Sequence, residues 1–109
     1  MKNLIIVSLA LLVAGAVSVR ATDAKENWDK HCAKCHGRDG KGKTEMGKKL
    51  EIKDYTDAKV QEGMGNMKMF AAIRNGIKDG EKTRMKGYGD TLSPDEIRAL
   101  IQYIRGFKQ

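Results

Sequence analysis

The sequence predicts an all-α domain of three to four helices joined by long loops. In the C-terminal segment, apolar residues recur at the spacing of one helical face: Ile97, Leu100, Ile101 and Ile104. Glycines and charged residues separate the predicted helices, and no segment alternates apolar and polar residues as a half-buried strand does. We therefore expect helices and loops without a β-sheet.

The last helix has the clearest start signal. Ser93 is its predicted cap, and Pro94 follows in the first turn, where a missing N–H costs nothing. Glu96 completes a capping box with Ser93. An aromatic residue near the other end of the chain, Trp28, is expected to pack against this helix.

The other predicted elements rest on weaker signals. A first helix should begin at Thr22 or Asp23 and run through Trp28 into residues 32–36. Asn66 is the expected cap of a middle helix over residues 67–75. The apolar face expected for it comprises Phe70, Ile73 and Ile77. We expect a loop or turn over residues 47–52, a short helix over residues 53–61 and a charged turn over residues 78–82.

Five consecutive residues, Cys32-Ala33-Lys34-Cys35-His36, form a C-x-x-C-H motif, the attachment signature of a c-type haem. Two thiols three positions apart can form thioethers with neighbouring vinyl groups of one porphyrin. The adjacent imidazole can ligate the iron from below. The motif predicts one covalent haem c, attached through Cys32 and Cys35, with His36 as proximal ligand.

The same residues allow other interpretations. A redox dithiol would need a βαβ setting and would leave His36 unexplained. A zinc site would need a second pair of ligands, and His31 is the only other histidine. A disulfide across so short a loop would stabilise little. After the motif, the glycine-rich residues 37–43 should wrap around the proximal side, and one of their carbonyls should accept the Nδ1 proton of His36.

The sixth iron ligand is expected to be a methionine, because His31 lies on the attachment side and cannot reach the far face. Met46 is too close in sequence to cross to that face. Met67 and Met69 fall in the middle helix and are expected in the core. That leaves two candidates in glycine-flanked segments. Met85, shortly before the last helix, is the predicted ligand, and Met64 is the alternative.

The N-terminal residues have the pattern of an export signal. Lys2 precedes an apolar run over residues 4–17, and residues 19–21 offer a cleavage site. The run is shorter than the ~20 residues of a membrane-spanning helix, although an uncleaved anchor is the alternative. We predict a cleaved signal peptide over residues 1–21 and one domain over residues 22–109. Large aliphatic residues are sparse in that domain, so the chain without haem should be largely unfolded.

Taken together, these residues resemble the small class I monohaem cytochromes c, over the whole of residues 22–109. The motif lies near the start, the candidate ligand Met85 in a late loop, and a terminal helix should cross the first. Trp28 and Tyr103 match the aromatic positions of that crossing, and Ala24 stands where the family has a small residue. Many members have a proline after the ligand methionine, and here Lys86 follows Met85.

The predicted function is electron transfer without enzymatic activity, because an iron held by histidine and methionine has no free position for substrate. We expect a soluble, monomeric periplasmic carrier without stable membrane insertion after signal cleavage. Its partners would be a redox donor and acceptor with acidic docking patches, not nucleic acid. The chain carries a formal charge of +7. The basic residues expected around the haem edge are Lys34, Lys41, Lys43, Lys48, Lys49, Lys68, Arg74, Lys82, Arg84 and Lys86.

Two alternative functions use the same haem. The chain could be the electron-accepting subunit of a dehydrogenase or oxidase complex. If no methionine ligates, a five-coordinate haem would suit a peroxidase or gas sensor, although no acid–base pair is evident in the sequence.

Overall fold

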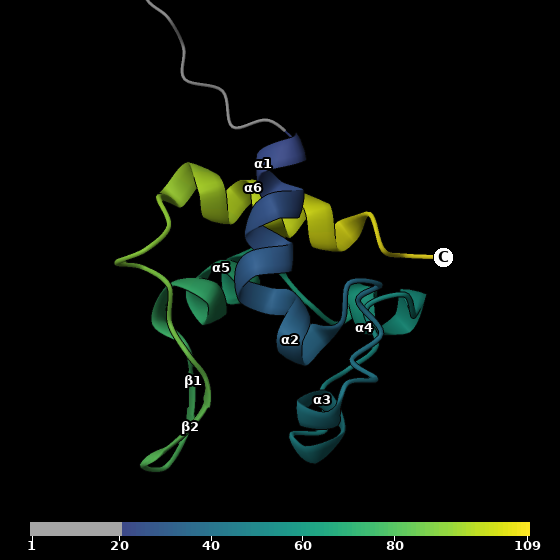
Figure 1. The fold of residues 1–109 in the computed structure, drawn as a ribbon, viewed down its shortest axis with the longest axis vertical. Coiled ribbons are helices and arrows are strands. Elements are labelled where there is room, and N and C mark those ends of the chain that lie inside the picture. Colours follow the sequence, from purple (N-terminus) through teal and green to yellow (C-terminus); the bar gives the residue numbers. More distant parts are fainter. Residues whose placement is uncertain (1–20) are drawn as a thin grey trace, which may run out of the picture.

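The computed structural model describes residues 21–109, so the predicted signal peptide lies outside the described residues apart from its last position. The described chain begins as a helical column made of α1 (Ala21–Asn27), a π-helical turn η1 (Trp28–Cys32) and α2 (Ala33–His36). In the π-helical turn the Ala33 N–H bonds to the Trp28 carbonyl, five residues earlier. Figure 1 shows this column crossing the C-terminal helix α6 (Pro94–Arg105).

The predicted first helix is confirmed where it enters the motif, and its predicted start is wrong. Thr22 and Asp23 already lie inside α1, so neither caps it. The crossing of α1 and α6 buries Ala24 and Trp28, which are 2% and 1% exposed.

Two short helices occupy the segment after the motif. Helix α3 (Glu45–Lys49) takes up much of the predicted loop, and it begins where the Thr44 side chain accepts a hydrogen bond from the Gly47 N–H. Helix α4 (Ala58–Glu62) begins later than predicted, after the capping residue Asp57. One-turn helices like these leave little periodicity in a sequence.

Helix α5 (Asn66–Asn75) confirms the middle helix but not its cap. Gly65 precedes the helix, and Asn66 is its first residue. The buried side chains of α5 are Met69 and Ile73. Met67, which we expected in the core, is 89% exposed.

An antiparallel hairpin of β1 (Ile77–Asp79) and β2 (Lys82–Met85) replaces the predicted charged turn, so the expectation of no β-sheet is wrong. The fold is mostly helical with this one small sheet, which is roughly the predicted all-α class. Gly76 ends α5 with φ 78°, and Gly80 at the hairpin tip has φ 61°. Nearly all side chains of both strands are exposed, including Ile77, which we had placed on the apolar face of the middle helix. The register pairs Ile77 with Met85, Lys78 with Thr83 and Asp79 with Lys82.

The core confirms the predicted stripe of α6. The side chains that line it are buried: Ile97, Leu100, Ile101 and Ile104. The ring of Trp28 packs against Tyr103 and Phe107 at centroid distances of 5.9 and 5.1 Å. The capping box of Ser93 and Glu96 is formed as predicted. Within residues 21–109, no helix combines the length and the apolar character needed to cross a bilayer.

Candidate cofactor site

A cavity of about 880 Å³ opens beside the C-x-x-C-H motif. Its walls come from the motif, α5, α6, the hairpin and the loop before α4, and they are mainly apolar and aromatic. Its volume falls within the roughly 300–1,000 Å³ typical of small-molecule and cofactor sites. The four residues predicted to bind the haem all line it: Cys32, Cys35, His36 and Met85.

The motif is held by its own loop. The Thr44 hydroxyl donates to the Cys35 carbonyl at 2.6 Å, and the Gly42 N–H donates to the His36 carbonyl at 2.8 Å. Gly47 sits so close that a Cβ there would lie 2.7 Å from the Cys35 carbonyl oxygen. The start of α3 therefore packs directly on the carbonyls of α2 and fixes the orientation of Cys35 and His36.

The two thiols and the imidazole lie in a low-dielectric environment. Burial, together with the neighbouring Cys35, raises the pKa of the Cys32 thiol to about 12. Cys32 and Cys35 are both free, so they form no disulfide. Burial lowers the pKa of His36, which favours the neutral imidazole that a metal requires.

Aromatic rings, rather than a hydrogen bond, surround His36. The Tyr55 ring stacks on the imidazole at 5.2 Å and 19°, and the Trp28 ring lies 5.5 Å from it. The Nδ1 atom is buried and has no hydrogen-bond partner among residues 21–109, so the predicted carbonyl acceptor is wrong. Neighbouring carbonyls already have donors. Gly37 accepts from the Trp28 Nε1–H at 3.0 Å, and His36 itself accepts from the Gly42 N–H.

The methionines separate clearly. Met64 and Met85 are half-buried and line the cavity, whereas Met46 is 38% exposed and does not. Met69 also lines the cavity but is part of the core, as predicted. The structure therefore leaves Met64 and Met85 as candidates for the sixth iron ligand, as the sequence did.

The backbone on both sides of Met85 is tightly packed. A Cβ on Gly76 would lie against the Met85 carbonyl oxygen, and one on Gly87 would lie 2.6 Å from the carbonyl carbon of Asn75. The N–H of Tyr88 donates to the Ile73 carbonyl at 2.8 Å. The end of α5 and the chain after β2 are therefore in close contact. This contact holds the backbone of residues 85–87, where many members of the family have a proline and this chain has Lys86.

The sequence did not identify several of the cavity residues. Tyr55 and Tyr88 both line it, and the Tyr88 hydroxyl donates to the His31 carbonyl at 3.0 Å. The Tyr88 ring also packs on the His31 ring at 5.3 Å. Tyr88 lies between Gly87 and Gly89, which mark its loop in the sequence. Tyr55 lies in a turn within the segment that we expected to be a short helix, so no sequence signal placed it at the cavity.

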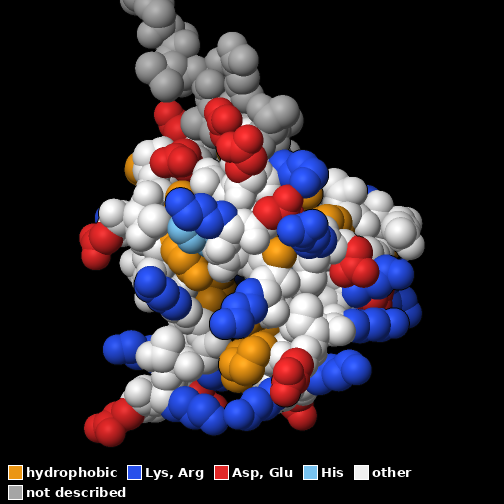
Figure 2. All heavy atoms as spheres, in the orientation of Figure 1, with side chains coloured by type: hydrophobic (Ala, Val, Ile, Leu, Met, Phe, Trp, Pro, Cys, Tyr) orange, Lys and Arg blue, Asp and Glu red, His pale blue; other side chains and the backbone are white. Residues whose placement is uncertain are grey.

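Basic side chains stand around the cavity. Of the predicted set, Lys68, Arg84 and Lys86 line it, and the others do not; Lys53 and Lys78 line it without having been predicted. Arg84 donates to the Leu50 carbonyl at 2.5 Å, which links the hairpin to the loop after α3. Figure 2 shows hydrophobic side chains exposed on one face with Lys and Arg side chains along their borders.

These residues fit a c-type haem. A large apolar cavity suits a flat porphyrin. Two free thiols and a neutral imidazole lie in one wall, and methionine side chains that could ligate the iron lie in other walls. The basic rim suits the carboxylates of such a ring.

Comparisons with known proteins point to the same cofactor. Residues 19–104 match the family described as "Cytochrome C oxidase, cbb3-type, subunit III". A curated relative, "Cbb3-type cytochrome c oxidase subunit FixP" of Azorhizobium caulinodans, is 36% identical over 74 residues, which are 68% of this chain and 22% of that protein. The chain thus spans about a fifth of the length of this relative.

Solved structures show the same likeness. "KustC0563 c-type cytochrome" gives a TM-score of 0.70 with 29% identity, covering 79% of this chain and 98% of that chain. A point mutant of that protein gives a TM-score of 0.69 with 30% identity, covering 79% and 99% of the two chains.

Proposed function

Because the chain belongs to the cbb3-type cytochrome c oxidase subunit III family of c-type cytochromes, carries a covalent haem c and transfers electrons, we propose which residues hold that haem. Cys32 and Cys35 would form the two thioethers, and His36 and Met85 would ligate the iron. The observation that supports this assignment is that all four line one apolar cavity.

The haem supplies a one-electron Fe(III)/Fe(II) couple, and the residues of this chain adjust it. Burial keeps His36 neutral and therefore able to ligate. The thioether of Met85 favours the ferrous state relative to harder ligands. The packed glycines on either side of Met85 hold it in place without a proline.

If His36 and Met85 both ligate, the iron would have no free position for substrate, so we propose a carrier rather than an enzyme. A five-coordinate peroxidase or gas sensor would require Met85 and Met64 to stay away from the iron. Both line the cavity, which favours closed coordination.

We further propose an exported, periplasmic and monomeric protein, released by signal cleavage after Ala21. The basic rim of Lys53, Lys68, Lys78, Arg84 and Lys86 would steer it to acidic patches on its donor and acceptor. The alternative is a fixed role as the electron-accepting subunit of a complex, which the likeness to FixP favours. Intact mass of the exported protein and co-purification with an oxidase distinguish these two roles.

The ligand assignment is tested by the optical spectra of protein matured in a host that attaches haem c. Wild type, Met85→Ala and the matched control Met64→Ala are compared in the ferric and ferrous states. We expect a low-spin haem whose far-red Met–ferric band disappears in Met85→Ala and persists in Met64→Ala. The reverse pattern would make Met64 the ligand. A high-spin wild-type spectrum that shifts with carbon monoxide would favour the sensor or peroxidase function.

A further inference from the structure

A polar network lies directly behind one wall of the cavity. Gln61, only 5% exposed, donates from its side-chain Nε2 to the carbonyls of Tyr55 at 2.8 Å and Ile104 at 2.9 Å. Its own Oε1 accepts a hydrogen bond from Arg105 at 3.0 Å. A buried amide whose donors and acceptor are all hydrogen-bonded makes the segments that it joins more rigid.

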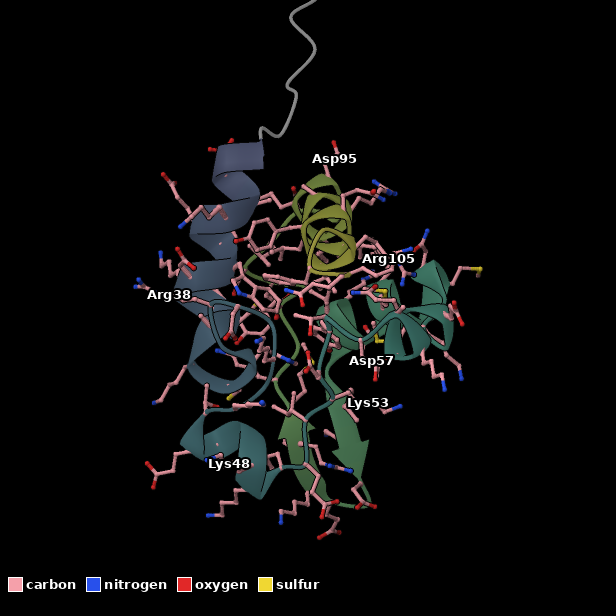
Figure 3. The ribbon with its side chains drawn as sticks, turned by 90° about the vertical axis from the view of Figure 1, so that its right-hand side faces the viewer. Arg38, Lys48, Lys53, Asp57, Asp95 and Arg105 are labelled. Atoms are coloured by element: carbon pink, nitrogen blue, oxygen red, sulfur yellow. The ribbon has the colours of Figure 1, made fainter. Side chains whose placement is uncertain are left out.

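Arg105 extends this network to the next segment. Its Nη1 also donates to the Gln61 carbonyl at 2.9 Å, and its Nη2 donates to the Met64 carbonyl at 2.5 Å and to Asn66 Oδ1 at 2.7 Å. Figure 3 shows Arg105 between α6 and the region of α4 and α5. The planar guanidinium therefore joins the last turn of α6 to the chain between α4 and α5.

The residues joined in this way belong to the cavity. Tyr55, Met64 and Ile104 all line it, and each has its carbonyl bonded by Gln61 or Arg105. Tyr55 stacks on the His36 imidazole, so this contact also depends on the position of the cavity wall that Tyr55 and Met64 form. Neither Gln61 nor Arg105 lines the cavity, so both act from one layer behind it.

The charge of Arg105 is bonded only by neutral groups. Its acceptors are two backbone carbonyls and the amide oxygens of Gln61 and Asn66. Among residues 21–109 the ion pairs are Lys25 with Asp29 and Arg98 with Asp95, so no carboxylate forms a salt bridge with Arg105. A half-buried charge acts through a lower dielectric than an exposed one and is screened less by salt.

We propose that Arg105, seated by Gln61, sets the reduction potential of the haem: it holds the Tyr55–Met64 wall against α6 and keeps a positive charge behind it. Oxidation of the iron adds a positive charge, so a nearby cation disfavours the ferric state and raises the potential. Arg105 and Gln61 are positioning residues, and their role rests on the proposed placement of the haem in this cavity.

The test is a potentiometric titration of the holoprotein with three variants. Arg105→Gln removes the charge, Arg105→Lys keeps the charge but loses the planar fork, and Lys108→Gln removes an exposed charge nearby as the matched control. We expect a clear fall in potential for Arg105→Gln and a much smaller change for both Arg105→Lys and Lys108→Gln. The two Arg105 variants should also exchange the amide hydrogens of residues 61–69 faster.

A fourth variant keeps the test decisive if Arg105→Gln folds poorly. Gln61→Glu keeps an oxygen that accepts from Arg105 and puts a carboxylate charge beside it, while it loses the two donated bonds to the Tyr55 and Ile104 carbonyls. Both changes weaken the arrangement that we propose, so this variant should lower the potential as well. Any of three results would overturn the proposal. The first is an equal potential in Arg105→Gln and Lys108→Gln, and the second is an unchanged potential in Gln61→Glu. The third is unchanged amide exchange in both Arg105 variants. The far-red Met–ferric band is recorded in every sample. Its absence in wild type would instead refute the ligand assignment, independently of Arg105.

Discussion

Replacing Gly76 by alanine tests whether the packed base of the hairpin positions Met85. Gly76 has φ 78° and ψ −178°, a conformation that costs residues other than glycine about 1–3 kcal/mol. The new Cβ would also lie 2.7 Å from the Gly87 nitrogen, in addition to its contact with the Met85 carbonyl oxygen. Such overpacking costs about 1–3 kcal/mol. The holoprotein should therefore lose roughly 2–6 kcal/mol of unfolding free energy.

The assay is thermal unfolding of the holoprotein together with its ferric spectrum. A domain of this size loses about 4–8 °C of Tm per kcal/mol, so Gly76→Ala should lower the Tm by at least about 8 °C. The far-red Met–ferric band should weaken or disappear, because the carbonyl of Met85 is displaced directly.

A matched control separates contact from backbone strain. Gly80 at the hairpin tip also has positive φ, 61°, but a Cβ there would meet no atom within 4 Å. Gly80→Ala should therefore show only the backbone cost of about 1–2 kcal/mol and keep the far-red band. If Gly76→Ala matches Gly80→Ala in both Tm and spectrum, the base of the hairpin does not position Met85.

Three further predictions concern the fold. Trp28→Ala should lower the unfolding free energy by about 3–5 kcal/mol in urea denaturation, because it empties the crossing of α1 and α6; a loss below about 1 kcal/mol would contradict the packing. The pKa of Glu96 is held below its ordinary 4.5, chiefly by the hydrogen bond from the Ser93 N–H. Its carboxylate should therefore stabilise the fold by about 0.3–1 kcal/mol near neutral pH, and the stability gap to Glu96→Gln should close as the pH falls below about 4.5. The Cys32→Ala, Cys35→Ala double variant should show little helicity by far-ultraviolet circular dichroism, since without haem the cavity of about 880 Å³ lacks its core; native-like helicity would refute this.

Two matched variants accompany these tests. Trp28→Phe keeps an aromatic ring at the crossing and should lose much less stability than Trp28→Ala. Asp95→Asn removes a carboxylate whose side chain is 70% exposed and lies outside the capping box. It should show little of the acid dependence that distinguishes wild type from Glu96→Gln, and equal behaviour of the two variants would contradict the role of the capping box.

The parts of the fold that sequence predicted well have strong local signals. Ser93, Pro94 and Glu96 specify the start of α6 within four residues, and the apolar period specifies its buried face. The C-x-x-C-H motif likewise places both thiols and the imidazole within five residues. Its spacing alone therefore predicted that Cys32, Cys35 and His36 would lie together at a cofactor site.

The hairpin was missed because only its turn leaves a signal in the sequence, the Asp79-Gly80 dipeptide. A strand is recognised by alternation between a buried and an exposed face, and the side chains of β1 are exposed throughout. The hairpin instead follows from two positive φ angles, at Gly76 and Gly80. The same dipeptide occurs at Asp39-Gly40 in a loop without strands, so it does not by itself specify a hairpin.

Contacts between distant segments were equally out of reach. The stacking of Tyr55 on His36 and the bonds from Arg105 to residues 61–66 join positions far apart in the chain. The choice between Met64 and Met85 depends on the same long-range packing. Sequence spacing narrowed the methionines to these two, and the geometry keeps both beside the cavity.

The π-helical turn η1 has a consequence for how this chain tolerates changes in length. Successive residues of an α-helix are rotated by about 100°, so two residues eight positions apart would lie about 80° apart around the axis. The extra residue in η1 reduces this offset, which is consistent with the 5.5 Å between the rings of Trp28 and His36. Deleting one of residues 29–31 would convert η1 to ordinary α-helix and keep the two rings in phase. The same deletion at residues 33–34 would destroy the C-x-x-C spacing, so this helix can lose one residue and keep both its phase and its motif only before Cys32.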